Sequence, residues 1–434
     1  MLDIERLSNM NHWWKLGNVK QEFIYSLKRD LFKDILNHLE IRQIIGIIGL
    51  RRVGKTTLFY EVIEYLIKEN INPKNIIYFS FDEIGAKLED LFKIYEENII
   101  KKNIGEEKIF VFLDEIQKLE DWQNKIKIYY DLYPNKIKFF ISGSASLNIL
   151  LKAKESLAGR IFYFYLDLLS FHEFLKLREK DITKMVKNPE LWKKEIKIEL
   201  NNYILKPFPE IINLSEEISS KYIKEAVIEK IIFKDLTDLF EIKEIEVLGK
   251  IINIIASNPG LMINLDDLSK DINVSRQLIS NYLYYLQTCF LIKEIKNFRG
   301  SLKASSRKLK KYYLLHPCFA LALSSAEIGK IMENIIMFDT KAINYWREKE
   351  KEVDFILKNN KEILPLEVKY KNNVRIKELK GLLKFMEKFN VMDAIVITED
   401  YEREEKIEDK NIKFISLWRW FLEKPMIIGR TSKK

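Results

Sequence analysis

The chain has 434 residues, enough for about three domains of ordinary size. It is 47% hydrophobic with only 14 glycines and 9 prolines, which excludes collagen-like chains and chains dominated by flexible linkers. The formal net charge is +9, so the position of the basic excess matters more than its size.

Cysteine, histidine and apolar patterning exclude several further classes. Two cysteines cannot build a disulfide framework, and no paired Cys or His spacing predicts a zinc site. The N-terminus has no apolar signal-peptide region, and no apolar run approaches the roughly 18 residues of a membrane span. We therefore expect a cytoplasmic protein that makes no membrane contact.

The N-terminal part alternates apolar strands and amphipathic helices. Apolar residues at helical spacing predict a first helix over 23–39. Strands are predicted at 44–48, 76–81, 109–113 and 137–141, and helices at 56–69 and 88–102. The strands are almost continuously apolar, which is typical of a parallel sheet covered on both faces.

A phosphate-binding loop follows the first strand. Residues 49–56 read Gly-Leu-Arg-Arg-Val-Gly-Lys-Thr, which fits the motif G-x-x-x-x-G-K-[ST] between a strand and a helix. Backbone N–H groups of such a loop surround phosphate oxygens, the lysine reaches the β- and γ-phosphates and the threonine binds Mg²⁺. The sequence therefore predicts ATP and Mg²⁺ as cofactors, with contacts from Gly49, Arg51, Arg52, Val53, Gly54, Lys55, Thr56 and Thr57.

Acidic and polar residues at the ends of later strands complete this candidate site. Asp114 and Glu115 follow the strand at 109–113. Asp114 is predicted to hold Mg²⁺ and Glu115 to activate the attacking water, while helix capping is the structural alternative. Ser142 and Ser144, at the end of the next strand, are both candidate γ-phosphate sensors, with a turn-forming role as the alternative. Arg160 is a candidate γ-phosphate contact in cis or in trans, or a plain surface arginine.

The segment 246–325 has the pattern of a winged helix-turn-helix. Helical patterns at 247–255, 265–272 and 275–286 precede two β-like segments at 290–298 and 312–315. The last helix is predicted to expose Arg276, Gln277, Ser280, Asn281 and Tyr284.

The region between the two β-like segments is strongly basic. Residues 291–311 have a net charge of +7, with Glu294 opposing Lys293, Lys296, Arg299, Lys303, Arg307, Lys308, Lys310 and Lys311. A basic wing of this kind favours contact with a DNA backbone. A protein-interaction module and a solvated charge run are the alternatives.

The C-terminal part contains a candidate metal site on a hairpin. Segments 353–358 and 362–369 flank a turn at 359–361, and a turn centred between residues 360 and 361 places Asp354 opposite Glu367. Lys369 shares the face of Glu367, and Glu333 on a preceding helix is a further candidate ligand. Carboxylates this close suggest a nuclease-type centre that binds Mg²⁺ or Mn²⁺, and a salt-bridged relic of such a fold is the equal alternative.

Taken together, these motifs resemble a known family. The order of 49–57, 112–117, 142–144, 159–160, 169–174, 345–347, 352–355 and 367–370 is similar to that of archaeal and bacterial AAA+-type, STAND-related ATPases with a C-terminal PD-(D/E)xK nuclease-like domain. The resemblance implies an α/β fold: a P-loop core (1–165), a helical lid (166–245), a winged helix-turn-helix (246–325) and a restriction-endonuclease-like domain (326–434). It also implies that Arg160 is a sensor-type arginine.

The sequence thus predicts a Mg²⁺-dependent ATPase that binds DNA and cleaves it through the end domain. Catalytic roles are predicted for Lys55, Glu115, Asp354, Glu367 and Lys369, and metal-binding roles for Thr56, Asp114, Glu333, Asp354 and Glu367. The alternatives are a signalling ATPase whose C-terminal domains bind protein partners, and a nucleotide-gated transcription regulator. A homo-oligomer is compatible with each.

Overall fold

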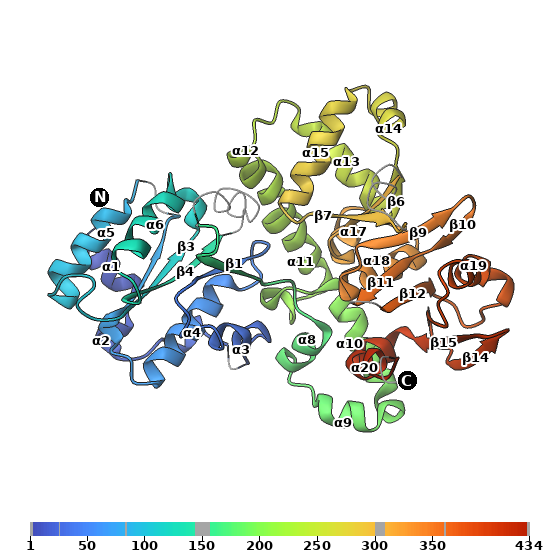
Figure 1. Ribbon diagram of the computed structural model, residues 1–434, viewed down its shortest axis with the longest axis horizontal. Helices are drawn as coiled ribbons and strands as arrows, with labels where there is room; N and C mark the ends of the chain where they lie inside the picture. Colours follow the sequence, from blue (N-terminus) through green and yellow to red (C-terminus); the bar gives the residue numbers. More distant parts are fainter. Residues whose placement is uncertain are drawn as a thin grey trace. The chain divides into compact units, whose positions relative to one another are not determined.

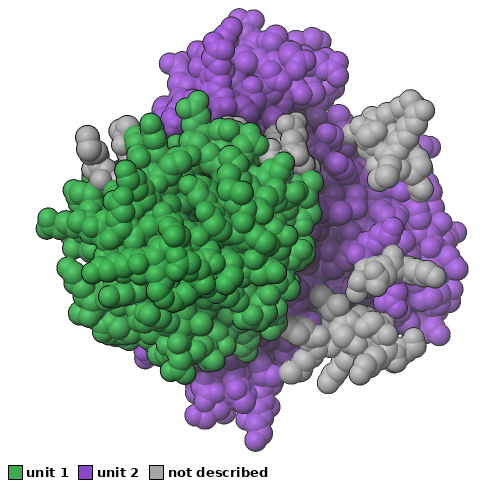
Figure 2. All heavy atoms as spheres, turned by 60° about the vertical axis from the view of Figure 1, so that its left-hand side comes forward, with its two compact units in different colours: residues 1–168 green, residues 169–434 purple. Residues whose placement is uncertain are grey.

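The computed structural model describes residues 3–25, 27–82, 85–143, 157–299, 309–359 and 362–431. The chain divides into two compact units, residues 1–168 and 169–434, which Figure 2 shows in different colours. Each unit has its own sheets and its own buried side chains, and each is described separately.

Unit 1 is built on one parallel sheet of five strands (Figure 1). The strand order is β2-β3-β4-β1-β5, with β1 Ile44–Ile48, β2 Ile76–Ser80, β3 Ile109–Asp114, β4 Ile137–Gly143 and β5 Ile161–Tyr165. The four predicted strands are confirmed, and β1, β3 and β4 are buried throughout. The edge strand β5 was not predicted, although its sequence Ile-Phe-Tyr-Phe-Tyr is continuously apolar and aromatic; its side chains are exposed or half-buried.

The two helices predicted at 56–69 and 88–102 are present in unit 1, whereas the helix between β3 and β4 was not predicted and the N-terminal helix differs. Helices α4 (Lys55–Lys68), α5 (Leu88–Tyr95) and α6 (Trp122–Leu132) are accompanied by the short α1 (Ile4–Met10) and α2 (Trp13–Leu16). The helix predicted over 23–39 is wrong: a 3-10 turn at Gln21–Phe23 and a short α3 (Leu31–Leu36) are found instead. Tertiary contacts override the helical period here, because Lys28 pairs with Glu61 and Arg29 bonds to backbone carbonyls.

Unit 2 begins with helices, as predicted. They are α8 (Phe171–Leu177), α9 (Ile182–Lys187), α10 (Pro189–Leu205), α11 (Glu216–Lys221) and α12 (Leu236–Leu239), with π-helical turns at 222–228 and 231–235. A capping box formed by Ser170 and Glu173 starts α8.

Three helices and a mixed sheet follow. In chain order the elements are α13 (Ile245–Ser257), β6 (Leu261–Ile263), α14 (Leu265–Ile272), α15 (Arg276–Thr288), β7 (Ile292–Asn297) and β8 (Lys310–Leu314). Asn264 and Ser275 cap α14 and α15 through their side chains. All the helices expected here are present, and the short β6 is an addition.

The sheet formed by β6, β8 and β7 continues into the end of the chain. Strand β7 pairs in parallel with β9 (Asn344–Glu348), and β9 pairs with β10 (Lys351–Val353), so the order is β10-β9-β7-β8-β6. Helices α17 (Pro317–Leu323) and α18 (Ile328–Thr340) lie between β8 and β9 in the chain.

A further sheet completes unit 2. Its order is β11-β12-β13-β15-β14, with β11 Phe355–Asn359, β12 Glu362–Lys369, β13 Asp393–Thr398, β14 Arg403–Ile407 and β15 Lys410–Ser416, plus helices α19 (Lys380–Lys388) and α20 (Leu417–Thr431). Gly381 lets α19 approach β10 closely, since a Cβ there would lie 2.2 Å from the Glu352 carbonyl oxygen.

Candidate functional site

The phosphate-binding loop lies where the sequence places it, between the end of β1 and the start of α4. Gly54 caps α4 with φ 97°, a left-handed conformation that strains any residue with a side chain. The buried Lys55 ammonium donates to the carbonyl oxygens of Gly49 (3.1 Å) and Leu50 (2.7 Å). The loop therefore holds this charge beside its own backbone, at the N-terminus of a helix.

Asp114, at the end of β3, binds the residues that the motif predicts. Its Oδ2 accepts from the Thr56 hydroxyl at 2.5 Å and from the Tyr78 hydroxyl at 3.2 Å. Its Oδ1 accepts from Ser142 and, at 3.0 Å, from the Glu115 backbone N–H. Ser144, the other candidate sensor, lies outside the described residues. The sheet order explains this convergence, because β4 separates β1 from β3 and brings Ser142 between the loop and Asp114.

Tyr78 is a contact that the sequence analysis missed. Burial and the nearby Asp114 carboxylate raise the pKa of Tyr78 well above its usual value, which keeps its hydroxyl protonated as a donor. Burial also raises the pKa of Tyr60, which hydrogen-bonds to Tyr78, to about 12. A tyrosine within an otherwise apolar strand was the available signal.

Glu115 follows directly after Asp114 and adopts a left-handed backbone conformation, with φ 50°. The amide of Gln117 donates to its carboxylate. This conformation is uncommon for a residue with a side chain and frequently marks functional positions.

The other predicted loop contacts differ in exposure. Val53 is buried, Arg52 is exposed and Thr57 and Arg51 are half-buried. Arg52 is also left-handed, with φ 63°. Three of these four side chains are accessible at the rim of the loop.

Arg29 is a second missed contact of the loop. Its guanidinium donates to the carbonyl oxygens of Val53 (2.8 Å) and Asp167 (2.8 Å). A Cβ on Gly49 would lie 2.2 Å from the Leu166 carbonyl oxygen, so the glycine is required for this close approach. The loop is thus fastened to residues 166–167, at the end of unit 1.

Arg160 is not brought to the phosphate loop of its own chain. It precedes β5, and its carbonyl accepts from the N–H of Ile44 at the start of β1 (2.8 Å). The loop follows the other end of β1, roughly 15 Å away at the rise of an extended strand. The Arg160 guanidinium pairs with Asp131 at 3.2 Å. The geometry therefore disfavours a contact in cis.

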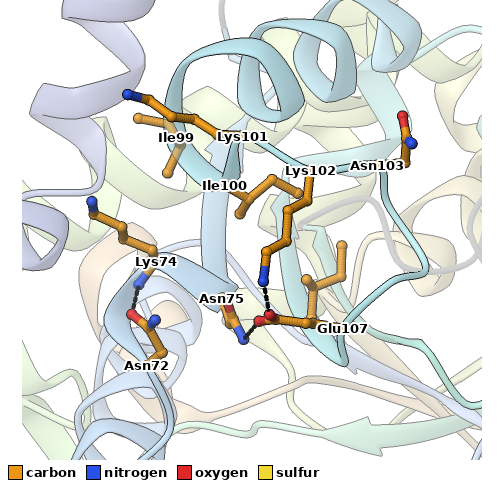
Figure 3. Close-up of a pocket in the computed structure, with 10 residues that line it drawn as sticks. Asn72, Lys74, Asn75, Ile99, Ile100, Lys101, Lys102, Asn103 and Glu107 are labelled. Atoms are coloured by element: carbon orange, nitrogen blue, oxygen red, sulfur yellow. Dashed lines mark hydrogen bonds and ion pairs between the residues drawn. The ribbon is translucent and has the colours of Figure 1, made fainter.

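A small cavity in unit 1 lies at this same remote edge of the sheet. It has a volume of about 250 Å³ and is lined by residues that include Asn72, Lys74, Asn75, Lys102 and Glu107 (Figure 3). Lys102 and Asn75 both bond to the Glu107 carboxylate. These residues precede β2 and β3, whereas the phosphate loop follows β1, so the cavity is separate from the phosphate loop.

The carboxylates of the end domain meet in the predicted register. The pairing of β11 with β12 places Phe355 opposite Leu366, which continues to Asp354 opposite Glu367. The Val368 N–H donates to Asp354 Oδ2 at 2.8 Å, and the Asp354 N–H donates to Glu367 Oε2 at 3.3 Å. Lys369 Nζ lies 2.6 Å from Glu367 Oε1, so these two residues share a face as predicted.

A lysine from another strand occupies the centre of this group. Lys311 of β8 has a side chain only 1% exposed. Its Nζ lies 3.1 Å from Glu333 Oε1, 2.5 Å from Glu352 Oε1 and 3.7 Å from Asp354 Oδ1. The assignment of Lys311 to a DNA-contacting wing is therefore wrong, because its ammonium group is buried and paired with carboxylates of the same chain.

The pKa values reflect this crowding. Burial disfavours the Lys311 ammonium, but Glu333 and the other acidic neighbours outweigh it and raise its pKa well above the usual value. Burial also opposes ionisation of Glu333, yet Lys311 and Lys330 lower its pKa to about 2. Asp354 behaves differently: burial first, and then the charge of Glu367, raise its pKa well above the usual value.

The end-domain residues do not fit a divalent metal ion. Asp354 and Glu367 have four carboxylate oxygens, and each faces a donor: two backbone N–H groups, Lys369 and Lys311. Across the described part of the chain, no group of three or more His, Cys, Asp or Glu is arranged to hold a metal. Glu333, Asp354 and Glu367, the predicted metal ligands, thus face donors from the chain itself, and their metal-binding role stays a prediction.

The basic segment 291–311 is also partly neutralised. Glu294 pairs with Lys310 at 2.9 Å and lies 4.0 Å from Lys296. Arg299 donates to the Arg347 carbonyl. Three predicted wing residues, Lys303, Arg307 and Lys308, lie outside the described residues. On α15, Arg276, Gln277 and Tyr284 are exposed and Ser280 and Asn281 are half-buried.

Comparison with known proteins identifies the first part of the chain. Residues 41–175 match the family described as "AAA domain". The matched residues include the five-stranded parallel sheet and the phosphate loop of unit 1, which are thus similar to an AAA domain. Residues 199–328 and 329–420 match two families described only as domains of unknown function, DUF8612 and DUF4143.

Relatives with similarity along most of the chain are known. The chain is 28% identical to the uncharacterized protein MJ1544 of Methanocaldococcus jannaschii, covering 90% of each chain. It is 28% identical to MJ1637 of the same organism, covering 93% of this chain and 89% of that one. The solved Aeropyrum pernix ORC2 protein is similar at 15% identity and a TM-score of 0.39, over 74% of this chain and 97% of that chain.

No helix among the described residues is long and apolar enough to cross a membrane.

Proposed function

We propose that the AAA domain binds and hydrolyses Mg²⁺-ATP at the loop 49–56. The observation that carries this proposal is the direct contact of Thr56 and Ser142 with Asp114. A hydroxyl and a carboxylate oxygen 2.5 Å apart, at the N-terminus of a helix, fit the first and second coordination spheres of Mg²⁺. The Mg²⁺ ion would neutralise charge on the β- and γ-phosphates.

The residues around the loop have separate roles in the proposed hydrolysis. Backbone N–H groups of the loop and the Lys55 ammonium bind the phosphates. Thr56 and Asp114 would hold Mg²⁺, and Glu115 would accept a proton from the attacking water. Ser142 lies close enough to Asp114 to report the state of the γ-phosphate.

Arg160 is proposed to act in trans, on nucleotide bound to a second copy of the chain. It lies at the end of the sheet opposite the phosphate loop, so a head-to-tail arrangement of copies is required to bring the two together. An arginine supplied across an interface stabilises charge in the transition state of phosphoryl transfer. Hydrolysis then depends on oligomerisation.

Phosphate release by mixtures of two variants tests this proposal. Lys55→Ala lacks a working loop but keeps Arg160, and Arg160→Ala lacks the arginine but keeps the loop. We expect each to be inactive alone and the mixture to recover part of the wild-type rate. Wild-type turnover in Lys55→Ala would reject the proposed ATP site. A mixture that stays inactive, although both variants are folded, would reject action of Arg160 in trans.

We also propose that α13–α15 with β6–β8 form a winged helix-turn-helix that binds DNA. The element order, the capped α15 and its exposed polar residues support this. DNA cleavage is not part of the proposal, because the oxygens of the end-domain carboxylates already face donors.

A protein partner is the second candidate for this surface. The Arg276 guanidinium lies 3.3 Å from Asp266, and α14 also carries Asp267 and Asp271, which makes the surface less basic than the sequence suggests. Fluorescence anisotropy with duplex DNA distinguishes the candidates. DNA binding predicts affinity that falls steeply with salt and weakens in Gln277→Ala, whereas a protein-binding surface predicts neither.

A further inference from the structure

The structure assigns the end-domain carboxylates a cation of their own: we propose that Lys311 replaces a metal ion and makes the cluster a metal-independent clamp. The cluster consists of Glu333, Glu352, Asp354 and Glu367 with Lys311, Lys330, Lys369 and Arg347. This inference rests on unit 2 alone and does not depend on ATP hydrolysis.

Charge balance is the first argument. Glu333 is paired with Lys311 at 3.1 Å and with Lys330 at 2.8 Å. Glu352 is paired with Lys311 at 2.5 Å and with Arg347 at 3.6 Å. Lys369 pairs with Glu367 at 2.6 Å. Four carboxylates thus face four cationic side chains, of which Lys311 is 1% exposed, so a divalent ion would add positive charge beside a buried ammonium group.

Saturation of the carboxylate oxygens is the second argument. Besides the donors to Asp354 and Glu367, Glu333 Oε1 accepts from the Tyr313 hydroxyl at 2.5 Å, and Oε2 accepts from Lys330. A metal ion would have to displace several of these donors at once. Each displaced buried donor would then lose its partner, which is unfavourable.

The position of Lys311 within β8 is the third argument. Its backbone lies opposite Ile295 of β7 and Met262 of β6, so strands flank it on both sides. Its ammonium also lies 5.3 Å from the centre of the Tyr345 ring. Lys311 cannot leave the cluster by a change of rotamer into solvent, because its side chain is enclosed.

The clamp joins parts of unit 2 that are distant in sequence. Lys311 comes from β8, Glu333 from α18, Glu352 from β10, and Asp354 and Glu367 from the β11–β12 hairpin. The parallel pairing of β7 with β9 joins the same two regions through the backbone. The proposed DNA-binding elements and the end domain are therefore held as one rigid body by ion pairs, without metal.

Thermal unfolding of the nucleotide-free full chain, in EDTA and in millimolar Mn²⁺, tests the inference. The wild type is expected to unfold at the same Tm in both. Lys311→Met should lower the Tm in EDTA by about 10 °C, because it leaves buried carboxylates uncompensated, and Mn²⁺ should restore part of the loss. Lys310→Met is the matched control on the same strand, with an expected change of about 2 °C or less.

A double variant keeps the test decisive if Lys311→Met does not fold. Lys311→Met with Glu333→Gln removes one charge of each sign and should be more stable in EDTA than Lys311→Met, or fold where the single variant does not. A wild-type Tm that rises in Mn²⁺ but no longer does so in Asp354→Asn would overturn the inference. An unchanged Tm in Lys311→Met would overturn it as well.

Discussion

Two aspartates, one in each unit, show how different surroundings give the same residue different chemistry. Asp114 is the last residue of β3, and Asp354 lies between β10 and β11. Asp114 accepts hydrogen bonds from three hydroxyls and one backbone N–H, all of them neutral donors. Asp354 lies in a cluster with buried ammonium groups and other carboxylates.

The difference lies in what neutralises the carboxylate. Neutral donors orient the Asp114 carboxylate but leave its charge in place, so that a divalent ion bound with nucleotide gains a charged partner. In unit 2 the charge is already balanced by the chain, and a metal ion would compete with lysines. Four predictions would break or sharpen this contrast.

The largest expected effect concerns Glu115. Glu115→Gln should keep ATP affinity and lower turnover by about 10²–10⁴-fold, the range for loss of a general base. Isothermal titration with ATP and steady-state phosphate release measure the two quantities. Turnover near the wild-type value would mean that another residue is the general base, and that Glu115 has no catalytic role beside Asp114.

The next effect compares the two aspartates directly. Asp114→Asn should lower ATP turnover by about 10²-fold or more, because Mg²⁺ loses its charged partner. Asp354→Asn should leave turnover unchanged. Phosphate release at matched protein concentrations compares the turnover of the two variants. A comparable loss in Asp354→Asn would show that the end-domain cluster takes part in the reaction.

A third carboxylate, Glu61 of α4, is buried and has one cationic partner, Lys28. Burial raises its pKa from 4.5 to about 7, although Lys28, 3.4 Å away, acts in the opposite direction. A raised folded-state pKa means that wild-type stability falls as pH rises from 4.5 to 7. The free energy of unfolding of Glu61→Gln, relative to that of the wild type, should therefore rise by about 1–3 kcal/mol between pH 4 and pH 8.

Urea unfolding of both proteins at the two pH values measures this difference. Parallel stability profiles across this range would mean that the ion pair with Lys28 fully offsets the effect of burial on the pKa of Glu61.

The smallest effect concerns the basic segment. Lys310→Ala should change the salt slope of DNA binding by less than about 1, because Lys310 is already paired with Glu294. Anisotropy titrations over a range of salt concentrations provide the slope. A larger change would mean that DNA draws Lys310 away from Glu294.

Much of the AAA site was predictable because its signals are local. The loop motif fixes Lys55 and Thr56, and parallel strand ends bring Asp114 and Ser142 to the same edge. The turn symmetry of the end-domain hairpin likewise gave Asp354 opposite Glu367, and the observed register agrees.

Lys311 was misassigned because the order of charges along a sequence does not tell whether a side chain points into the protein or into solvent. Strand β8 is buried over residues 311–314 and shows no alternation that would have separated an inward lysine from outward ones. Arg29 and Tyr78 were missed because their partners are distant in sequence. The choice between cis and trans action of Arg160 depended on the position of β5, a strand that the sequence analysis did not identify.

The most direct test of the contrast is the number of Mn²⁺ ions bound per chain, measured by electron paramagnetic resonance with a saturating nonhydrolysable ATP analogue. The account predicts one ion per chain, lost in Lys55→Ala and retained in Asp354→Asn. A second ion, or one that persists in Lys55→Ala and disappears in Asp354→Asn, would contradict it.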